Sequence, residues 1–354
     1  MSTASDVASA AESRTLVAST LEEYGSLVRE ALPRYLPVRE PRRYLYDLVA
    51  DYPNRGGKMM RPSICLATAR AFGGRLEDAL GSAVAFELLH NAFLIHDDVQ
   101  DESDERRGRP TMHKLHGVPL AINVGDTLTL LSLRPLLDNH ANLGVHLCMQ
   151  ILEELQQVAR DSAEGQAMEL GWRHDNSVDV TAADYLDMVL KKTCGMAAIY
   201  PARVGALIGT RGQISSGRVA RFVRFGFFLG AAFQIQDDLL NLFADQRYGK
   251  ELNGDIWEGK RTLMLIHLLQ ECTGPERERI TGILHAPRHT RREAQVRWIR
   301  ELMDTYGCID YAREMAHGMA GAAVVECAAA FEGVPDSRDR RFIEGLPRWV
   351  FERN

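Results

Sequence analysis

The sequence predicts an all-α protein built as one large helical domain. Three long apolar stretches without proline, residues 79–100, 144–170 and 218–243, have the length and pattern of helices. Runs of alternating β-branched residues, which indicate strands, are scarce, and the 13 prolines fall mostly between the apolar stretches. No long linker divides the chain, so we expect about ten or more helices in a single domain over residues 16–354.

The bulk composition is that of a globular protein without signs of nucleic-acid binding. The 354 residues are 45% hydrophobic with a net charge of −6, whereas nucleic-acid-binding domains are usually basic. The six cysteines lie far apart and form no C-x-x-C pair, which favours a reduced, cytoplasmic setting. Residues 1–15 are small and polar, so we expect a disordered N-terminal segment and no signal peptide. The longest apolar runs, such as residues 225–233, are too short for a transmembrane segment.

The helix predicted over residues 79–100 ends in a cluster of acids. Asp97, Asp98 and Asp101 follow a strongly apolar segment. Asp97 and Asp101 lie on the same helix face, one turn or about 6 Å apart along the axis. Carboxylates at this spacing repel each other unless a cation lies between them, and Mg²⁺ prefers such oxygen ligands together with phosphate oxygens. The alternative is a solvated helix end, although acids there oppose the helix dipole. The cluster therefore predicts a magnesium site at the edge of an apolar space.

The helix predicted over residues 218–243 repeats this arrangement. Asp237 and Asp238 again follow a long apolar segment. Two unrelated pairs of surface acids would be the simpler interpretation. Two clusters at the ends of helices that look buried instead favour facing helices, which present their carboxylates to shared metal ions.

Basic residues occur in short segments around both acid clusters. A diphosphate substrate would need such cations, because Arg binds phosphate as a fork and Lys as a mobile point charge. Any single basic pair is more often part of a solvated surface. The P-loop pattern G-x-x-x-x-G-K-[ST] is absent, and nucleotide binding has little support. The basic segments contain Lys58, Arg61, Arg106, Arg107, Lys191, Lys192, Lys250, Lys260 and Arg261.

Five segments of the chain resemble the trans-isoprenyl diphosphate synthases of the polyprenyl synthetase family. In order along the chain, they are GGKMMRP, FELLHNAFLIHDDVQDESDERRGRPTMH, KKT, FQIQDDLLNLF and GKRT. The resemblance covers residues 50–270 and points to the geranylgeranyl diphosphate synthases among them. It implies an all-α fold with a central active-site cavity, a homodimer, and Mg²⁺ as cofactor, with three ions per active site when substrate is bound. It also implies head-to-tail condensation of isopentenyl diphosphate with allylic diphosphates.

The resemblance also implies roles for individual residues. Asp97, Asp101 and Asp237 match the family's Mg²⁺ ligands, and Asp98 and Asp238 match the acids that support them. The groups around the allylic diphosphate, with Lys192 among the catalytic ones, are matched by Arg106, Lys192, Thr193, Gln234, Lys250 and Lys260. The isopentenyl diphosphate site is matched by Lys58, Arg61, His90 and Arg107. A lone histidine in an apolar helix is usually a core residue, but this one lies two turns before Asp97 on the same face. The pattern departs at Asn241, where many members have aspartate, which puts the metal affinity of that side in question.

Residues before Asp97 bear on product length. One helical turn is about as long as one isoprene unit, about 5 Å, so successive turns can measure the growing chain. Phe93 lies one turn before Asp97, the small Ala92 lies next to it, and Leu89 lies two turns back. Members of the family that make farnesyl diphosphate often have bulky aromatic residues at both of the first two positions. The pattern therefore favours a C20 product, geranylgeranyl diphosphate, over a C15 or C25 product.

Two other functions share part of this pattern. A class I terpene cyclase has the same fold and first acid motif, but it usually has an Asn/Ser/Glu metal triad in place of the second pair. A silent partner subunit of a heteromeric synthase should have lost aspartates or arginines, and none is missing here. The set Lys58, Arg61 and Arg107, available for a second diphosphate, favours condensation over the cyclase.

Overall fold

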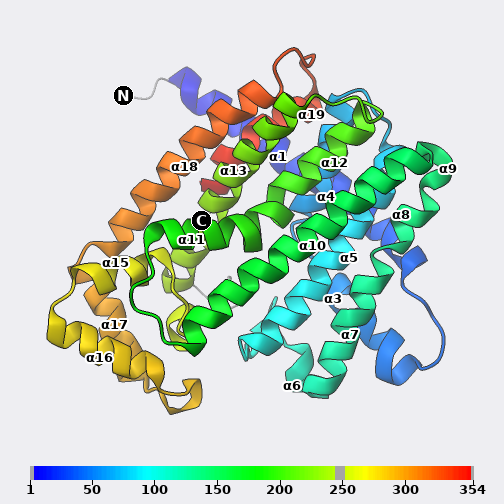
Figure 1. The fold of residues 1–354 in the computed structure, drawn as a ribbon. Helices are drawn as coiled ribbons and strands as arrows, with labels where there is room; N and C mark the ends of the chain where they lie inside the picture. The colour runs from blue at the N-terminus through cyan, green and yellow to red at the C-terminus, as the bar shows by residue number, and fades with distance from the viewer. Residues whose placement is uncertain (1–3, 244–251, 352–354) are drawn as a thin grey trace.

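The computed structural model describes residues 4–243 and 252–351, apart from the side chains of residues 4–10. It confirms the all-α class, because the regular elements of the described residues are helices and one short hairpin (Figure 1). The hairpin pairs β1 (Glu105–Arg106) with β2 (Arg109–Pro110) in antiparallel register. The helices are α1 (Ala4–Ala31), η1 (Leu32–Tyr35), η2 (Arg42–Tyr46), α2 (Asp47–Val49), α3 (Asp51–Asn54), α4 (Met60–Ala71), α5 (Leu76–Gln100), α6 (Met112–His116), α7 (Val118–Leu131), α8 (Arg134–Asp138), α9 (His140–Leu143), α10 (Val145–His174), α11 (Ala182–Val189), η3 (Leu190–Ile199), α12 (Tyr200–Gly209), α13 (Ser216–Phe243), α14 (Gly254–Glu258), α15 (Leu263–Glu271), α16 (Gly274–His285), η5 (Arg288–Thr290), α17 (Glu293–Thr305), α18 (Cys308–Ala330) and α19 (Arg338–Phe351).

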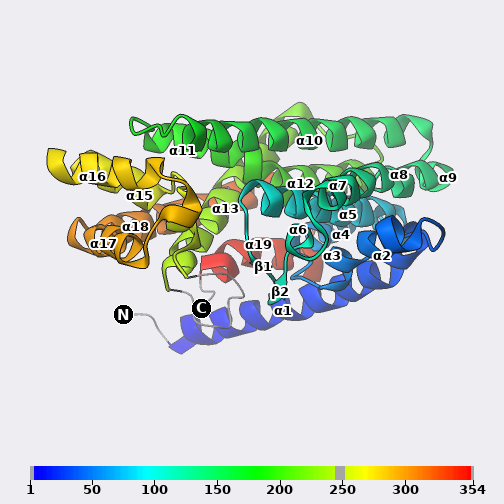
Figure 2. The ribbon, with the colours of Figure 1, turned by 90° about the horizontal axis from the view of Figure 1, so that it is seen from below.

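The two helices that carry the acid clusters, α5 and α13, lie inside the bundle. α5 packs against α4 and α7, and α13 packs against η3, α18 and α19. Seen from below, α1 forms one outer layer of the molecule, and α10 and α11 form the opposite one (Figure 2). Because neighbours surround α5 and α13, both helices are apolar on most of their faces.

Buried apolar side chains fill the space between these helices. Phe72, Phe222 and Phe331 form an aromatic cluster with ring centroids 5.5 to 5.9 Å apart, which ties the end of α4 to α13 and α18. Such tilted and edge-on pairs add about 0.5–1.5 kcal/mol each beyond their buried area. Leu88 of α5 and Leu229 of α13 are fully buried. The acidic ends of the two helices therefore extend from a packed core.

By length and composition alone, α5 could also cross a membrane. Its most apolar window has a mean hydropathy of 1.2, and 67% of that window is buried inside the fold. The expectation of no transmembrane segment rested on shorter continuous apolar runs, such as residues 225–233, and overlooked the length of this helix. Since α4, α7, α8 and α12 pack around it, α5 has the features of a core helix of a globular protein.

The part of the N-terminal segment that the structure describes is helical. Residues 4–31 form one helix, α1, whereas we expected disorder over residues 1–15. No glycine or proline occurs before Gly25, and α1 packs against α19. The packing is close: a Cβ atom at Gly345 would lie 2.8 Å from the hydroxyl oxygen of Ser13. Tertiary packing therefore extends the helix beyond what its polar composition suggests. The domain boundaries stay a prediction.

Candidate active site

The structure brings the two acid clusters together at the ends of α5 and α13. Asp97 and Asp101 border a pocket of about 320 Å³. Asp237 and Asp238 border a smaller pocket of about 50 Å³. The two pockets adjoin, since both are lined by Asn241, Asp255 and Lys260.

The Asp97 carboxylate lies between two cations. Lys192 Nζ is 3.3 Å from its Oδ1 atom, and Arg106 Nη2 is 3.3 Å from its Oδ2 atom. Lys192 also pairs with Glu169 of α10, whose Oε1 atom is 3.0 Å away. Burial alone would lower the pKa of Lys192, but Glu169 and Asp97 raise it above its ordinary value. Lys192 therefore stays charged at the edge of the pocket, where a negatively charged substrate would meet it.

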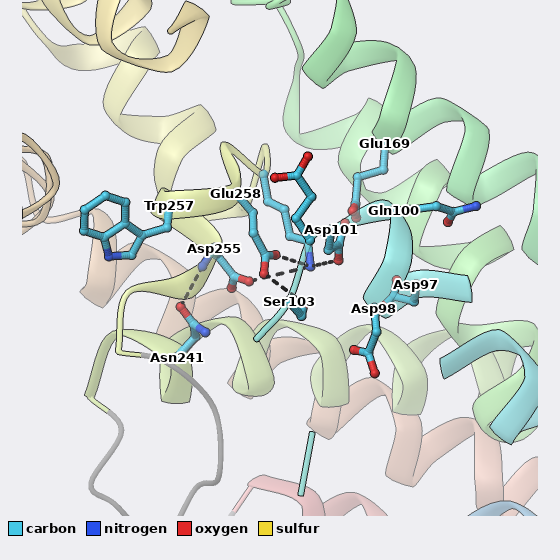
Figure 3. Close-up of polar contacts among 12 residues, drawn as sticks. Asp97, Asp98, Gln100, Asp101, Ser103, Glu169, Asn241, Asp255, Trp257 and Glu258 are labelled. Carbon is cyan, nitrogen blue, oxygen red and sulfur yellow. Dashed lines mark hydrogen bonds and ion pairs between the residues drawn. The ribbon is translucent and has the colours of Figure 1, made fainter. Parts of the chain in front are cut away.

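The Asp101 carboxylate is paired at both oxygens as well, and its side chain is only 1% exposed. Arg173, near the end of α10, pairs with Oδ1, and Lys260 Nζ is 2.7 Å from Oδ2. The same ammonium lies 2.8 Å from Glu258 Oε2 and 3.9 Å from Asp255 Oδ1. Figure 3 shows these three acids directed toward one point between α5 and α14. Burial alone would lower the pKa of Lys260, but Asp101 and Glu258 raise it well above its ordinary value.

Asp98, the middle acid of the first cluster, points away from the place where Asp101, Asp255 and Glu258 meet, and it is fully buried (Figure 3). Its carboxylate accepts a hydrogen bond from Tyr52 Oη at 2.5 Å and another from Arg106 Nε at 2.9 Å. Burial raises the pKa of Asp98, and Arg106 opposes that rise. Asp98 therefore fixes the position of Arg106.

Asp238 has a similar environment in the second cluster. It accepts hydrogen bonds from Tyr185 Oη at 2.8 Å and from Gln234 Nε2 at 2.7 Å, and burial raises its pKa to about 6. Thr193 Oγ1 donates to Gln234 Oε1 at 2.8 Å, which extends this network to η3. The neighbouring Asp237 is half-buried and faces the pockets instead. One acid in each pair is thus tied into the protein while the other borders open space.

A third pocket, of about 400 Å³, is rich in cations. All four residues that the sequence suggested for isopentenyl diphosphate line it, namely Lys58, Arg61, His90 and Arg107. Asp237 and Phe233 line it as well, so Asp237 borders both this pocket and the one that contains Lys192. Burial and the nearby Arg61 and Arg107 hold the pKa of His90 well below its ordinary value, so the imidazole is neutral at neutral pH.

Two adjacent arginines reach different pockets because of the hairpin between β1 and β2. Arg107 and Gly108 both have positive φ, 55° and 69°, as the two central residues of a tight hairpin turn require. Arg106 turns toward Asp97 and Asp98, and Arg107 lines the cationic pocket. Gly57 leaves room for the second side chain, since a Cβ there would lie 2.8 Å from Arg107 Nη2.

Lys192 and Thr193 lie on η3, a π-helical segment of ten residues. Such segments are rare and often occur at functional sites. Neighbouring helices approach the segment through glycines: a Cβ at Gly165 would lie 2.4 Å from the backbone nitrogen of Lys192, and one at Gly230 would lie 2.7 Å from Cys194. The unusual backbone is therefore packed tightly from two sides.

Some residues predicted from the sequence do not line the three pockets, and some residues that do line or support them were not predicted. Leu89 and Ala92 are buried on α5 and Phe93 is half-buried, while Lys250 lies outside the described residues. Asp255 and Glu258 share a segment with Lys260, and this spacing could have identified them. The other residues lie singly in the sequence, and no local motif marks them as part of the site. The missed residues are Arg55, Glu87, Glu169, Arg173, Asp255, Glu258 and Arg288.

Comparisons with known proteins agree with this arrangement. Residues 42–303 match the family model described as polyprenyl synthetase. The chain is 32% identical to a geranylgeranyl pyrophosphate synthase of Geoglobus acetivorans, covering 96% of this chain and 100% of the relative. It is 34% identical to a short chain isoprenyl diphosphate synthase of Methanothermobacter thermautotrophicus, over 84% and 87%. It is 31% identical to a geranylfarnesyl diphosphate synthase of Natronomonas pharaonis, over 96% and 98%.

Solved structures show the same similarity in three dimensions. The geranylgeranyl pyrophosphate synthetase of Pyrococcus horikoshii superposes with a TM-score of 0.82 at 32% identity, covering 96% of this chain and 99% of that one. A polyprenyl synthase of Caulobacter crescentus, complexed with calcium and isoprenyl diphosphate, also has a TM-score of 0.82, at 26% identity over 96% and 98%. The chain therefore belongs to the polyprenyl synthetase family and is a trans-prenyltransferase.

Proposed function

We propose that this enzyme condenses isopentenyl diphosphate head-to-tail with allylic diphosphates and that its product is geranylgeranyl diphosphate. One observation carries the proposal: a cationic pocket lies next to acid-lined pockets that contain their own cations, and Asp237 borders both. The arrangement offers separate sites for two diphosphate groups. A terpene cyclase, which uses one diphosphate, has no need of the cationic pocket lined by Lys58, Arg61 and Arg107.

Asp97, Asp101 and Asp237 are the residues that would hold Mg²⁺, with three ions per active site as part of this proposal. Their carboxylate oxygens suit this metal, which also takes phosphate oxygens as ligands. Among residues 4–243 and 252–351, no three acidic, His or Cys side chains are placed to hold one ion together. In the structure, Asp97 and Asp101 pair instead with Lys192, Arg106, Arg173 and Lys260. Bound Mg²⁺ would neutralise charge on the departing diphosphate.

The acids would hold the metal, and the basic side chains would bind the diphosphate. Lys192, Arg106 and Lys260 already lie at the edges of the acid-lined pockets, with their charges held by buried partners. Preplaced cations of this kind stabilise charge that develops on the leaving group. The apolar residues of α5 would keep water from the allylic cation. The double bond of the second substrate then attacks, and the released diphosphate accepts the proton.

The C20 product rests on the small Ala92 beside Phe93. Both lie on α5 before the first acid cluster, and Ala92 is fully buried. The relatives differ in this respect, since one is named for geranylgeranyl and another for geranylfarnesyl diphosphate. C15 and C25 products remain the alternatives to be distinguished by experiment.

We also propose a homodimer in the cytoplasm. Large apolar side chains are exposed on α7, α8 and the start of α10, and a monomer rarely leaves such a surface uncovered. All six cysteines are free thiols, which agrees with a reducing compartment.

The decisive experiment incubates purified protein with Mg²⁺, isopentenyl diphosphate and a C5, C10 or C15 allylic diphosphate, followed by mass spectrometry of the products. A C20 diphosphate is the expected result. A C15 or C25 product keeps the reaction and rejects the assignment of product length. A hydrocarbon product would indicate a cyclase, and no product would indicate a silent subunit.

Two variants test the metal assignment in the same assay. Asp97→Ala and Asp237→Ala should each keep the helical circular dichroism spectrum and lose most turnover, because each removes a proposed metal ligand. Asp310→Ala is the matched control, since this aspartate is 78% exposed on α18 and pairs with Arg313. Turnover close to that of the unchanged enzyme in both site variants would reject the assignment.

A further inference from the structure

The C-terminal helix contacts Lys58, a residue that lines the cationic pocket, although the helix lies outside the segment that matches the family model. The match ends at residue 303, and α19 spans residues 338–351. Trp349, on its last turn, lies against the first cation of the pocket: Lys58 Nζ is 5.8 Å from the centroid of the indole ring. A cation within about 6 Å of an aromatic face is attracted by the ring, most strongly by tryptophan.

The helix that presents this ring is fixed at both ends. Near its start, Tyr24 of α1 donates a hydrogen bond to Asp339, and Arg338 pairs with Glu23 at 2.6 Å. At its end, the ring of Phe351 contacts His317 of α18 edge-on, with centroids 5.0 Å apart. Trp349 is therefore held in place by a docked helix, and its side chain is half-buried.

The backbone around Lys58, in contrast, does little to fix the position of its side chain. It follows Gly56 and Gly57, both with positive φ, and precedes Met59, which has φ 52°. Its side chain is exposed, and a lysine ammonium is carried on a flexible four-carbon chain. An aromatic face can confine such an ammonium without neutralising its charge, which stays available to a diphosphate. The other cations of the pocket, Arg61 and Arg107, are more deeply placed.

We propose that Trp349 is a positioning residue for Lys58 and thereby sets the affinity of the cationic pocket for the diphosphate of isopentenyl diphosphate. The proposal rests on the function proposed above for that pocket. It assigns to the C-terminal helix a part in binding the second substrate, and none in binding the allylic one, whose proposed groups lie around Lys192 and Lys260.

Replacement of the ring tests the proposal. Trp349→Leu keeps an apolar side chain and removes the aromatic face, so KM for isopentenyl diphosphate should rise about two- to fivefold. The kcat and the KM for the allylic substrate should not change. Trp349→Phe should restore most of the affinity. Phe351→Leu is the matched control, because it weakens the same helix end without touching the ring over Lys58.

A double-variant cycle separates a direct effect from a loss of helix docking. If Trp349 acts through Lys58, then Trp349→Leu should have no further effect on KM in a Lys58→Ala background. An equal effect in both backgrounds would overturn the proposal, as would an equal loss in Phe351→Leu. An unchanged KM in Trp349→Leu would overturn it as well.

Calorimetric titration of isopentenyl diphosphate distinguishes the failure of this inference from failure of the proposed function. The protein is first saturated with Mg²⁺ and an unreactive thio-analogue of the allylic diphosphate. If the unchanged enzyme binds no isopentenyl diphosphate, the proposed function fails and takes the inference with it. If it binds and Trp349→Leu binds equally tightly, only the role of Trp349 is rejected. Weaker binding by Trp349→Leu alone supports the proposal.

Discussion

Acids and cations at the first cluster neutralise one another in pairs. Asp97 and Asp101 lie one turn apart, where bare carboxylates would repel, and each has a cation at both oxygens. If a metal-bound diphosphate occupied the site, its metal ions would pair with the carboxylates, and its oxygen atoms would pair with the lysines and arginines. We infer that loading exchanges one set of ion pairs for another. Such an exchange avoids leaving any buried charge without a partner, which is the costly event in a buried site.

His90 gives a prediction about pH. The burial of the ring, with Arg61 and Arg107 nearby, holds its pKa well below the value of about 6.5 in the unfolded chain. Below about pH 6.5 the unfolded chain therefore binds a proton that the folded chain does not, so stability falls as the pH falls toward the lowered pKa. Above about pH 6.5 both forms are neutral and the effect is absent.

His90→Gln should therefore make the protein more acid-resistant. At about pH 5.5 the histidine lowers the unfolding free energy, and at about pH 8 it has no such effect. The difference in stability between the two pH values should therefore be smaller in the variant. Urea titrations at the two pH values measure it, with His289→Gln at an exposed site as the control. The same pH dependence in His90→Gln and the unchanged protein would contradict the prediction. Since glutamine is also a neutral donor, KM for isopentenyl diphosphate should change little.

Ala92 gives a prediction about product length. Ala92→Phe should shift the main product from C20 toward C15, because the larger side chain would close the space that the last isoprene unit fills. Overpacking of the fully buried site should also cost about 1–3 kcal/mol of stability. Ala83→Phe is the control: Ala83 is buried to the same extent, and nine residues place it on the opposite face of α5. Mass spectrometry of the products decides, and an unchanged chain length would show that Ala92 does not face the growing chain.

At the level of elements, η3 links helix packing to the site. Its π-helical backbone carries Lys192 and Thr193, and α10 and α13 approach it closely at Gly165 and Gly230. A methyl group at Gly165 would lie 2.4 Å from the nitrogen of Lys192, closer than any packed contact allows. The position of Lys192 therefore depends on a residue on another helix, 27 positions away in the sequence.

Gly165→Ala should displace Lys192 and weaken the enzyme in two ways. We expect a loss of about 1–3 kcal/mol in unfolding free energy, from overpacking, together with a higher KM for the allylic diphosphate and a lower kcat. Gly171→Ala is the matched control on the same helix, since a Cβ there meets nothing within 4 Å. This control should be neutral or should stabilise by up to about 1 kcal/mol. Urea unfolding and steady-state kinetics measure both variants, and equal behaviour of the two would reject the packing argument.

The sequence was most informative where local pattern and chemistry coincide. The apolar helices α5 and α13 and their terminal acids follow from the length and composition of the apolar stretches, and all four residues expected at the cationic pocket line it. The π-helical backbone of η3 was not predicted, and its close contacts with Gly165 and Gly230 on neighbouring helices have no local sequence signal. The pairing of Arg173 with Asp101 joins residues 72 positions apart and has no local signal. The helical N-terminal segment was missed for the same reason, since its partner is α19.

For the whole molecule, the exposed apolar surface and the active site are connected through α7. The elements α6, α7, α8, α9 and α10 adjoin along one side of the bundle (Figure 1). They expose Leu130 and Val145 to about the same extent, 69% and 70%, and Ile122 to 43%. α7 contacts α5 at His96, whose Nε2 atom lies 3.3 Å from Oδ1 of the exposed Asp126. His96 directly precedes the first acid cluster, so a change in α7 can reach the site through one side chain.

Ile122→Glu combined with Leu130→Glu should therefore convert a dimer to a monomer and also lower kcat per subunit. Charged side chains on this surface would have to be buried without partners in a homodimer, whereas a monomer leaves them in water. Analytical ultracentrifugation gives the mass, and kinetics on the same samples give the turnover. Val325→Glu is the control, at a site on α18 that is 68% exposed. A double variant that remains dimeric would move the interface elsewhere. A monomer with full activity would show that α7 holds the first acid cluster without help from a partner subunit.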